Sequence, residues 1–236
     1  MTATPPEGPP GPADIRYALA ATAAPGPAAD AAVRLGGGLR ALTRTVVGSM
    51  APDALLLEIA VEVEDLVERL TPHTRSSRYE QAQAISGEGT FANHPMIGPA
   101  NPCAPRIAMR VDGDRLVGDV VFGTPHEGPP GCAYGGYLAA GFDAILLMTA
   151  GINGLAGPTK SLAVHYRRPT PLHAPLRYVG EIDGVEDRVV RIRGALLDGD
   201  DTVYVEAVAE VARGARFGPV APEAPPVLPG GGTAVD

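Results

Sequence analysis

Residues 135–148 place apolar side chains on almost every side of a helical projection. A surface helix carries a single apolar stripe, so a helix that is apolar all round is expected to be buried by other elements. Four runs typical of β-strands follow it, at about 160–168, 175–184, 188–197 and 202–213. The chain is therefore expected to place one central helix against a sheet.

The segment before this helix predicts a β-hairpin. Apolar runs at 107–111 and 116–122 flank a tight turn at Asp112-Gly113-Asp114. Hairpin, buried helix and four further strands make an α+β domain, because the helix is segregated to one face of an antiparallel sheet. An antiparallel sheet that wraps around one buried central helix is the hotdog fold, which is the fold class we predict.

The N-terminal part is expected to be a helical extension. Apolar residues recur at helical spacing over 28–47, although three successive glycines weaken that helix, and a stronger amphipathic pattern covers 53–70. The second helix should pack its apolar side on another part of the protein. Both ends of the chain are rich in proline and are expected to be disordered. The predicted parts are a disordered N-terminus at 1–27, a helical extension with linker at 28–94, the hotdog domain at 95–213 and a disordered tail at 214–236.

Composition excludes several classes of function. The net charge is −8 with no basic stripe, so neither a nucleic-acid partner nor a membrane surface is expected. Two cysteines cannot build a disulfide framework, and the first residues lack the basic and apolar regions of a secretory signal. The longest uncharged apolar stretch is interrupted by glycines and a proline and is too short to span a bilayer. We therefore expect a cytoplasmic protein.

Four short motifs in this order resemble a known family. They are NPCAP at 101–105, FGTPHEGPPG at 122–131, YGG at 134–136 followed by Asp143, and YRRPTPL at 166–172. They are similar to acyl-CoA thioesterases of the hotdog superfamily, in the PaaI-like and THEM4-like group, over residues 95–213. In that group an Asp lies nine residues after a His and a Thr lies sixteen residues after the Asp. Tyr134, Asp143 and Thr159 have this spacing here.

The resemblance implies hydrolysis of an acyl-CoA to a free acid and CoA, without a metal or another cofactor. It assigns Asp143 as the general base or the nucleophile, and an aspartate in so apolar a helix is expected to be buried only if it is paired or functional. The backbone N–H groups of Gly135 and Gly136 would form the oxyanion hole at the start of the helix. Thr159 would help to hold the attacking water. Hotdog active sites close between two subunits, which implies a homodimer or homotetramer.

Other candidate residues follow from the same motifs. Tyr134 replaces the histidine of the family, and a phenol can orient a substrate as a hydrogen-bond donor or fill space, but it is not a base near neutral pH. Ser161 is expected to share the sheet face of Thr159 and is a second hydroxyl candidate. Arg167 and Arg168 have the guanidinium chemistry that binds the phosphates of CoA, although neighbours on a strand point to opposite sides.

Two alternatives remain at this stage. One is a hotdog enzyme that releases or cyclises an intermediate bound to an acyl carrier protein in secondary metabolism. The other is a degenerate hotdog protein that binds acyl groups without turnover, because the usual histidine is Tyr134. A Cys132–His126 nucleophile is disfavoured because no third member of a triad is evident. The five histidines have no metal-ligand spacing, so no metal site is predicted.

Overall fold

The computed structural model describes residues 27–74 and 91–214. The proline-rich ends predicted to be disordered therefore lie almost entirely outside the described residues. The elements in chain order are α2 (Pro27–Val47), α3 (Asp53–Leu70), η1 (Thr71–His73), β1 (Ala108–Asp112), β2 (Arg115–Val120), η2 (Thr124–His126), α5 (Gly135–Ile152), β3 (Thr159–Tyr166), β4 (Leu176–Glu186), β5 (Val189–Leu197) and β6 (Val203–Ala212).

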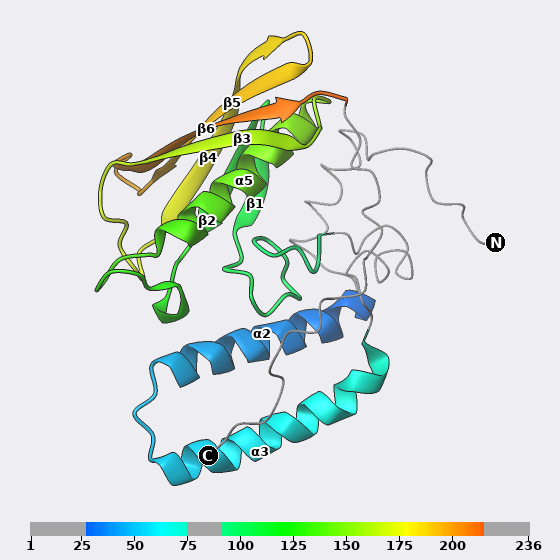
Figure 1. Cartoon of the computed structure of the whole chain (residues 1–236), viewed down its shortest axis with the longest axis vertical. Coiled ribbons are helices and arrows are strands. Elements are labelled where there is room, and N and C mark those ends of the chain that lie inside the picture. Colours follow the sequence, from blue (N-terminus) through cyan, green and yellow to red (C-terminus); the bar gives the residue numbers. More distant parts are fainter. Residues whose placement is uncertain (1–26, 75–90, 215–236) are drawn as a thin grey trace, which may run out of the picture.

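The six strands form one antiparallel sheet in the order β1-β2-β4-β5-β6-β3. Helix α5 runs along one face of this sheet (Figure 1). The hairpin β1–β2 and the run of four strands after the helix are confirmed, as is the α+β class with a central helix. The chain leaves the hairpin at one side of the sheet and returns, after α5, at the opposite edge with β3, so the helix lies across the strands between them.

The core lies between α5 and the sheet. Tyr178 of β4 is fully buried, and its hydroxyl donates to the carbonyl of Leu138 at 3.1 Å. Its ring meets Phe142 edge-to-face, with the ring centroids 4.9 Å apart. A Cβ on Gly141 would lie 2.3 Å from the Tyr178 hydroxyl, so only glycine lets the helix approach the strand this closely. This contact fixes the height and rotation of α5 on the sheet.

The expectation that α5 is buried on every side was wrong. Gly136 and Asp143 are exposed on the face of the helix that points away from the sheet. The apolar pattern does not identify this face, because its other residues are small or only half-buried alanines and leucines. By length and hydropathy α5 would pass as a membrane-spanning helix, yet 61% of it is buried inside the protein, as expected for a core helix.

Helix α2 forms as predicted and continues through its three glycines. Gly36 is buried against the backbone of Ala100, where a Cβ would lie 2.4 Å from the carbonyl oxygen. One turn later the Arg40 guanidinium donates to the carbonyl oxygens of Pro99 and Asn101, at 2.7 and 2.6 Å. The glycine and the arginine together join α2 to the loop that precedes β1.

Helix α3 spans the predicted residues, but it has no buried residue. Its apolar side chains include Leu57, Val61 and Val67, which are 68%, 65% and 59% exposed. The packing expected for this amphipathic helix is thus not present among the described residues of one chain. Figure 1 shows α3 lying beyond α2, on the side away from the sheet.

Candidate active site

Asp143 and Thr159 meet where the middle of α5 passes the start of β3. The Thr159 hydroxyl donates to Asp143 Oδ1 at 3.0 Å. The six residues between the end of α5 and β3 return the chain along the helix, which brings two residues sixteen apart into contact. The contact leaves Oδ2 of the carboxylate free of any partner among the described residues.

The Asp143 side chain is exposed in the single chain, so the expectation of a buried carboxylate was wrong. The physical reason is the open face of α5, since only the opposite face packs on the sheet. An exposed carboxylate keeps its hydration and has no need of a charged partner. Asp143 is therefore accessible to water or to a ligand.

Gly135 and Gly136 form the first two positions of α5. In the described part of the chain neither backbone N–H donates a hydrogen bond, whereas the N–H of Tyr134 just before them is bonded to the carbonyl of His126 at 2.8 Å. Unpaired N–H groups at a helix start carry the positive end of the helix dipole. This end of the helix can therefore accept a carbonyl oxygen that gains negative charge.

Two exposed tyrosines flank these glycines. The Tyr166 hydroxyl donates to the Gly135 carbonyl at 2.9 Å, and the Tyr134 ring lies so close to Gly136 that a Cβ there would lie 2.5 Å from a ring carbon. The rings are 54% and 56% exposed respectively. The Tyr134 hydroxyl has no hydrogen-bond partner among residues 27–74 and 91–214. Its ring covers the helix start, and its hydroxyl is open to solvent or ligand.

The helix start and the carboxylate are two separate groups within one chain. Gly136 and Asp143 are seven residues apart, so they lie on the same face of α5 but about 10 Å apart along its axis. The free N–H groups also point backwards along the axis, away from Asp143. One chain therefore cannot present both groups to the same carbonyl.

Ser161 does not share the sheet face of Thr159, which corrects the expectation from strand alternation. The ladder between β3 and β6 has an irregularity, in which Thr159 pairs with Val211 and Ser161 with Glu210. The extra residue, Lys160, makes a β-bulge and turns Ser161 to the face away from α5. There its hydroxyl lies 3.5 Å from the Glu210 carboxylate. Ser161 is thus not part of the group around Asp143.

Arg167 and Arg168 at the end of β3 both have partners within the chain. Arg167 Nε lies 2.7 Å from the Glu206 carboxylate in an exposed ion pair. Arg168 donates to the carbonyl of Val203 at 2.7 Å. Of these two arginines, only Arg168 keeps a charge that no carboxylate balances within the residues that the structure describes.

Tyr166 is a site residue that the sequence analysis missed. It belongs to the YRRPTPL motif, but strand alternation counted from Thr159 places residue 166 on the wrong face. The bulge reverses that alternation, so Tyr166 pairs with the buried Val205 and faces α5. The sequence pattern does not reveal the bulge, so it could not place Tyr166 on the face of β3 that points to α5.

His126 packs on Tyr137, which belongs to the first turn of α5. Their rings pack edge-to-face with centroids 4.8 Å apart, and His126 Nδ1 accepts a hydrogen bond from the N–H of Gly123 at 3.2 Å. Burial, with a smaller effect from the charge of Arg44, lowers the pKa of His126 below its ordinary value. The imidazole is thus held neutral, as its acceptor role requires.

This lowered pKa predicts a loss of stability in mild acid. His126 binds a proton more readily in the unfolded chain than in the folded one. Its contribution to the free energy of unfolding is therefore fully present above about pH 6.5 and is lost as the pH drops towards the lower pKa of the folded state. His126→Asn keeps a side-chain acceptor for Gly123 and should flatten this dependence. Urea unfolding between pH 5 and pH 8 would measure both proteins, and identical pH profiles would contradict the prediction.

No group of three or more His, Cys, Asp or Glu side chains suited to a metal ion occurs in the described segments. Cys103 is exposed and Cys132 is half-buried, and both are free thiols. The groups that this surface presents are the Asp143 carboxylate with the Thr159 hydroxyl, the hydroxyls of Tyr134 and Tyr166, and the amides of the helix start.

A solved structure of a thioesterase superfamily protein is similar to this chain. No protein-family model matches the chain. A crystal structure of a thioesterase superfamily protein matches with a TM-score of 0.69 at 27% sequence identity, over 77% of this chain and 90% of that one. A hypothetical thioesterase from Streptococcus pneumoniae TIGR4, solved with coenzyme A, matches at 19% identity and a TM-score of 0.42 over 47% of this chain and 90% of its own. The E. coli PaaI protein matches at 12% and 0.42, over 44% and 79%.

The first of these similarities confirms the predicted hotdog fold and the resemblance to thioesterases. The protein has the fold of the thioesterase superfamily, with a helical N-terminal part. Residues 91–214 make up only about half of the chain, so a match over 77% includes part of the first ninety residues as well. The similarity to this thioesterase superfamily protein therefore extends beyond the sheet and its central helix into the N-terminal part of the chain.

Proposed function

We propose that the protein hydrolyses a thioester of coenzyme A to a carboxylic acid and the free thiol. The observation that carries this proposal is the Asp143 carboxylate, held by Thr159 at 3.0 Å and otherwise open, on the central helix of a thioesterase-type fold.

We further propose that the active site forms between two copies of the chain. Asp143 of one subunit would face Gly135 of the partner subunit, because the two groups are about 12 Å apart along one helix. A two-fold axis near α5 would produce two such sites, since each helix contributes one group to each of them. The open face of α5 and the exposed rings of Tyr134 and Tyr166 support an interface here.

The reaction needs one base and one oxyanion hole. Asp143 takes a proton from a water molecule, and the water oxygen attacks the thioester carbonyl carbon. The carbonyl oxygen becomes an oxyanion that accepts hydrogen bonds from the amides at the helix start. When the tetrahedral intermediate collapses, the carbon–sulfur bond breaks, the thiolate leaves, and the proton returns to it. Alternatively the carboxylate itself attacks the carbonyl carbon, the carbon–sulfur bond breaks and the thiolate leaves, and water then hydrolyses the resulting anhydride to the free acid and the Asp143 carboxylate.

Thr159 positions the carboxylate in either mechanism. Its hydroxyl donates to Oδ1, which leaves Oδ2 to act on the water or on the carbonyl carbon. Tyr166 holds the Gly135 carbonyl and so orients the first peptide of the helix. Tyr134 would contact the substrate as a donor or as an apolar wall, since a phenol cannot replace a histidine as a base near neutral pH.

A carrier-protein thioester is a second candidate substrate. Arg167 and Arg168, expected to bind the phosphates of CoA, are engaged by Glu206 and by the Val203 carbonyl. This weakens the case that these two residues recognise CoA, and an acyl carrier protein presents the same thioester on a phosphopantetheine arm.

The test is thiol release from a panel of short, medium, long and aryl acyl-CoAs, with the matching acyl carrier protein thioesters in parallel. We expect turnover of at least one CoA thioester by the purified full chain. Turnover confined to carrier-protein thioesters would favour the second candidate. A folded protein that releases no thiol from either set, but is stabilised against heat by them, would be a binding protein.

A further inference from the structure

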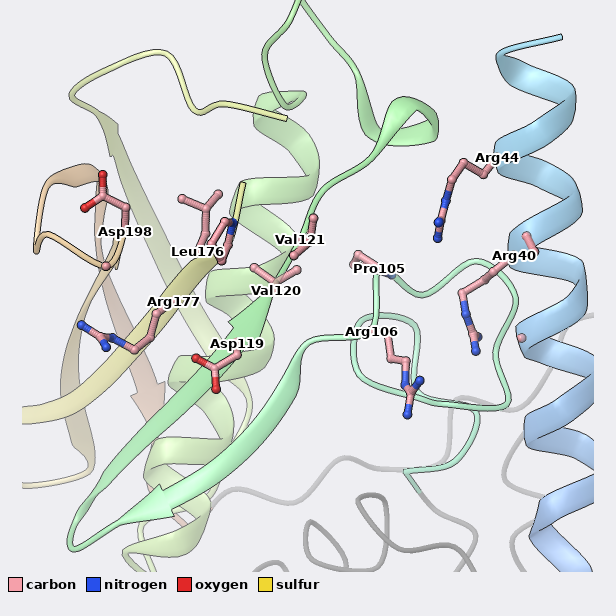
Figure 2. Close-up of a pocket in the computed structure, with 14 residues that line it drawn as sticks. Arg40, Arg44, Pro105, Arg106, Asp119, Val120, Val121, Leu176, Arg177 and Asp198 are labelled. Carbon is pink, nitrogen blue, oxygen red and sulfur yellow. The ribbon is translucent and has the colours of Figure 1, made fainter. Parts of the chain in front are cut away.

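A crevice of about 670 Å³ separates helix α2 from the end of the sheet where β2 ends and β4 begins. Its walls come from α2, from the loop before β1, from the end of β2 and from the start of β4 (Figure 2). The volume lies within the range of sites for small molecules and cofactors, about 300–1,000 Å³. None of the residues assigned to the thioester reaction lines it.

The wall nearest α2 is strongly basic. Arg40, Arg44 and Arg106 line it, and none of the three forms an ion pair with a carboxylate in the described part of the chain. Figure 2 shows Arg40 and Arg44 reaching from the helix towards the loop that carries Arg106. Burial and the charges of Arg106 and Arg44 lower the pKa of Arg40, which indicates that these cations repel one another.

Arg106 also has an unfavourable backbone conformation. Its φ is +66°, in the left-handed region that glycine and asparagine adopt most easily. An arginine in this conformation beside other arginines is unfavourable twice over, by backbone conformation and by charge. Such costs are typical of residues retained for binding.

The opposite wall only partly offsets the cluster. Asp119 lies 3.8 Å from Arg110, and Asp198 keeps its negative charge because its partners, the Tyr204 hydroxyl and two backbone N–H groups, are neutral. Arg177 adds a fourth guanidinium to this wall and pairs with Asp201 at 2.9 Å. Four guanidinium groups and two carboxylates thus line the crevice, which leaves an excess of positive charge in a chain whose net charge is −8.

The basic crevice continues towards the helix start of the candidate active site. A second cavity of about 610 Å³ shares Arg40 and Arg44 and reaches His126 and Tyr137. Tyr137 packs edge-to-face on Tyr134, with ring centroids 6.4 Å apart. A ligand with an anionic end in the basic crevice can thus extend a less polar part towards the first turn of α5.

We propose that the crevice between α2 and the sheet binds the phosphate groups of a nucleotide-type ligand through Arg44 and Arg106, while Arg40, whose two terminal nitrogens hold the carbonyls of Pro99 and Asn101, adds its positive charge. Planar guanidinium groups suit phosphate because they donate in a bidentate fork. Resting on the proposed function, the ligand is the phosphorylated nucleotide end of the CoA substrate. A separate nucleotide that regulates the protein presents the same chemistry, and the test distinguishes the two.

Binding is measured by calorimetry on the full chain with adenosine 3′,5′-bisphosphate, with adenosine as the uncharged control and inorganic phosphate as the minimal anion. We expect the bisphosphate to bind and adenosine not to bind. Arg44→Gln and Arg106→Asn should each weaken the bisphosphate about 10-fold or more. Arg34→Gln, on the same helix but outside the crevice, removes the same charge and should leave the affinity within about 2-fold.

Arg106→Asn separates a binding role from a structural one. Asparagine adopts the left-handed backbone readily and removes a repelled charge, so this variant should be at least as stable to urea while it binds the bisphosphate more weakly. Loss of stability without loss of binding would overturn the proposal. So would a wild-type protein that does not bind the bisphosphate, or equal affinities for wild type and both crevice variants.

Kinetics then identify the source of the phosphate. If CoA occupies the crevice, Arg44→Gln raises KM for an acyl-CoA about 10-fold and leaves KM for the corresponding N-acetylcysteamine thioester, which has no phosphate, unchanged. If the ligand is a separate nucleotide, both KM values stay unchanged while bisphosphate binding falls. The binding measurement does not depend on hydrolysis, so it tests the crevice even if the proposed thioesterase function fails.

Discussion

Replacing Asp143 with asparagine is expected to lower thioester hydrolysis at least about 100-fold, which corresponds to about 2.7 kcal/mol of transition-state stabilisation. The amide cannot accept a proton from water and is a poor nucleophile, so either mechanism loses its reacting group. Because Thr159 can still donate to the amide oxygen, the local geometry should be retained. The measurement is free-thiol release under saturating and subsaturating substrate.

The same variant is a clean test because Asp143 is exposed and contacts only one hydroxyl among its described neighbours. Its unfolding midpoint should match that of the wild type, since surface substitutions change stability by about 0.5 kcal/mol or less. Asp65→Asn, an exposed helical aspartate on α3, is the matched control and should hydrolyse the substrate at the wild-type rate. Equal activity in Asp143→Asn and wild type would exclude this carboxylate as the catalytic group.

Gly135→Pro is expected to lower the catalytic rate about 100- to 1,000-fold, the usual effect of removing one oxyanion-hole donor. Proline lacks the backbone N–H, yet it is favoured at the first position of a helix, and the extended Tyr134 before it, at ψ 128°, accepts a following proline. Thiol release measured under saturating substrate gives the rate.

Gly135→Ala is the control for this loss, because it adds a Cβ near the Tyr166 hydroxyl but keeps the N–H. We expect the alanine variant to retain most of the activity. If proline and alanine lower the rate equally, the added carbon atom is responsible and the amide does not stabilise the oxyanion.

These two variants together test whether the site combines two subunits. In randomly mixed dimers of Asp143→Asn and Gly135→Pro chains, about half contain one of each, and each of those has one site with both groups intact. Co-refolding the two inactive proteins should therefore restore about one quarter of the wild-type activity. No recovery would show that both groups must come from the same chain.

The fold was largely predictable from sequence. The apolar composition of the central helix and the alternating pattern of the strand segments around it indicate which segments form the core. The sixteen-residue spacing of Asp143 and Thr159 likewise predicted a pair that the structure brings into contact. Exposure of Asp143 was not predictable, because small residues such as Gly136 and Ala139 give an open helix face the same apolar appearance as a buried one.

Other parts of the site depend on contacts that sequence pattern does not carry. The bulge at Lys160 reverses which residues of β3 face α5, so Ser161 was selected wrongly and Tyr166 was missed. The basic crevice joins Arg40 and Arg44 on one helix with Arg106 in a distant loop, and their proximity depends on how α2 packs on the loop before β1.

The length of the segment between α5 and β3 sets the relative position of Asp143 and Thr159. Gly157 lies against the backbone of Ala212, so close that a Cβ would overlap its carbonyl oxygen, and this pins the segment to β6. One inserted residue after this pinned point would move Thr159 to the other face of the strand, because side chains alternate. The length of this connection is thus as much a condition for the contact between Asp143 and Thr159 as the identity of the two residues.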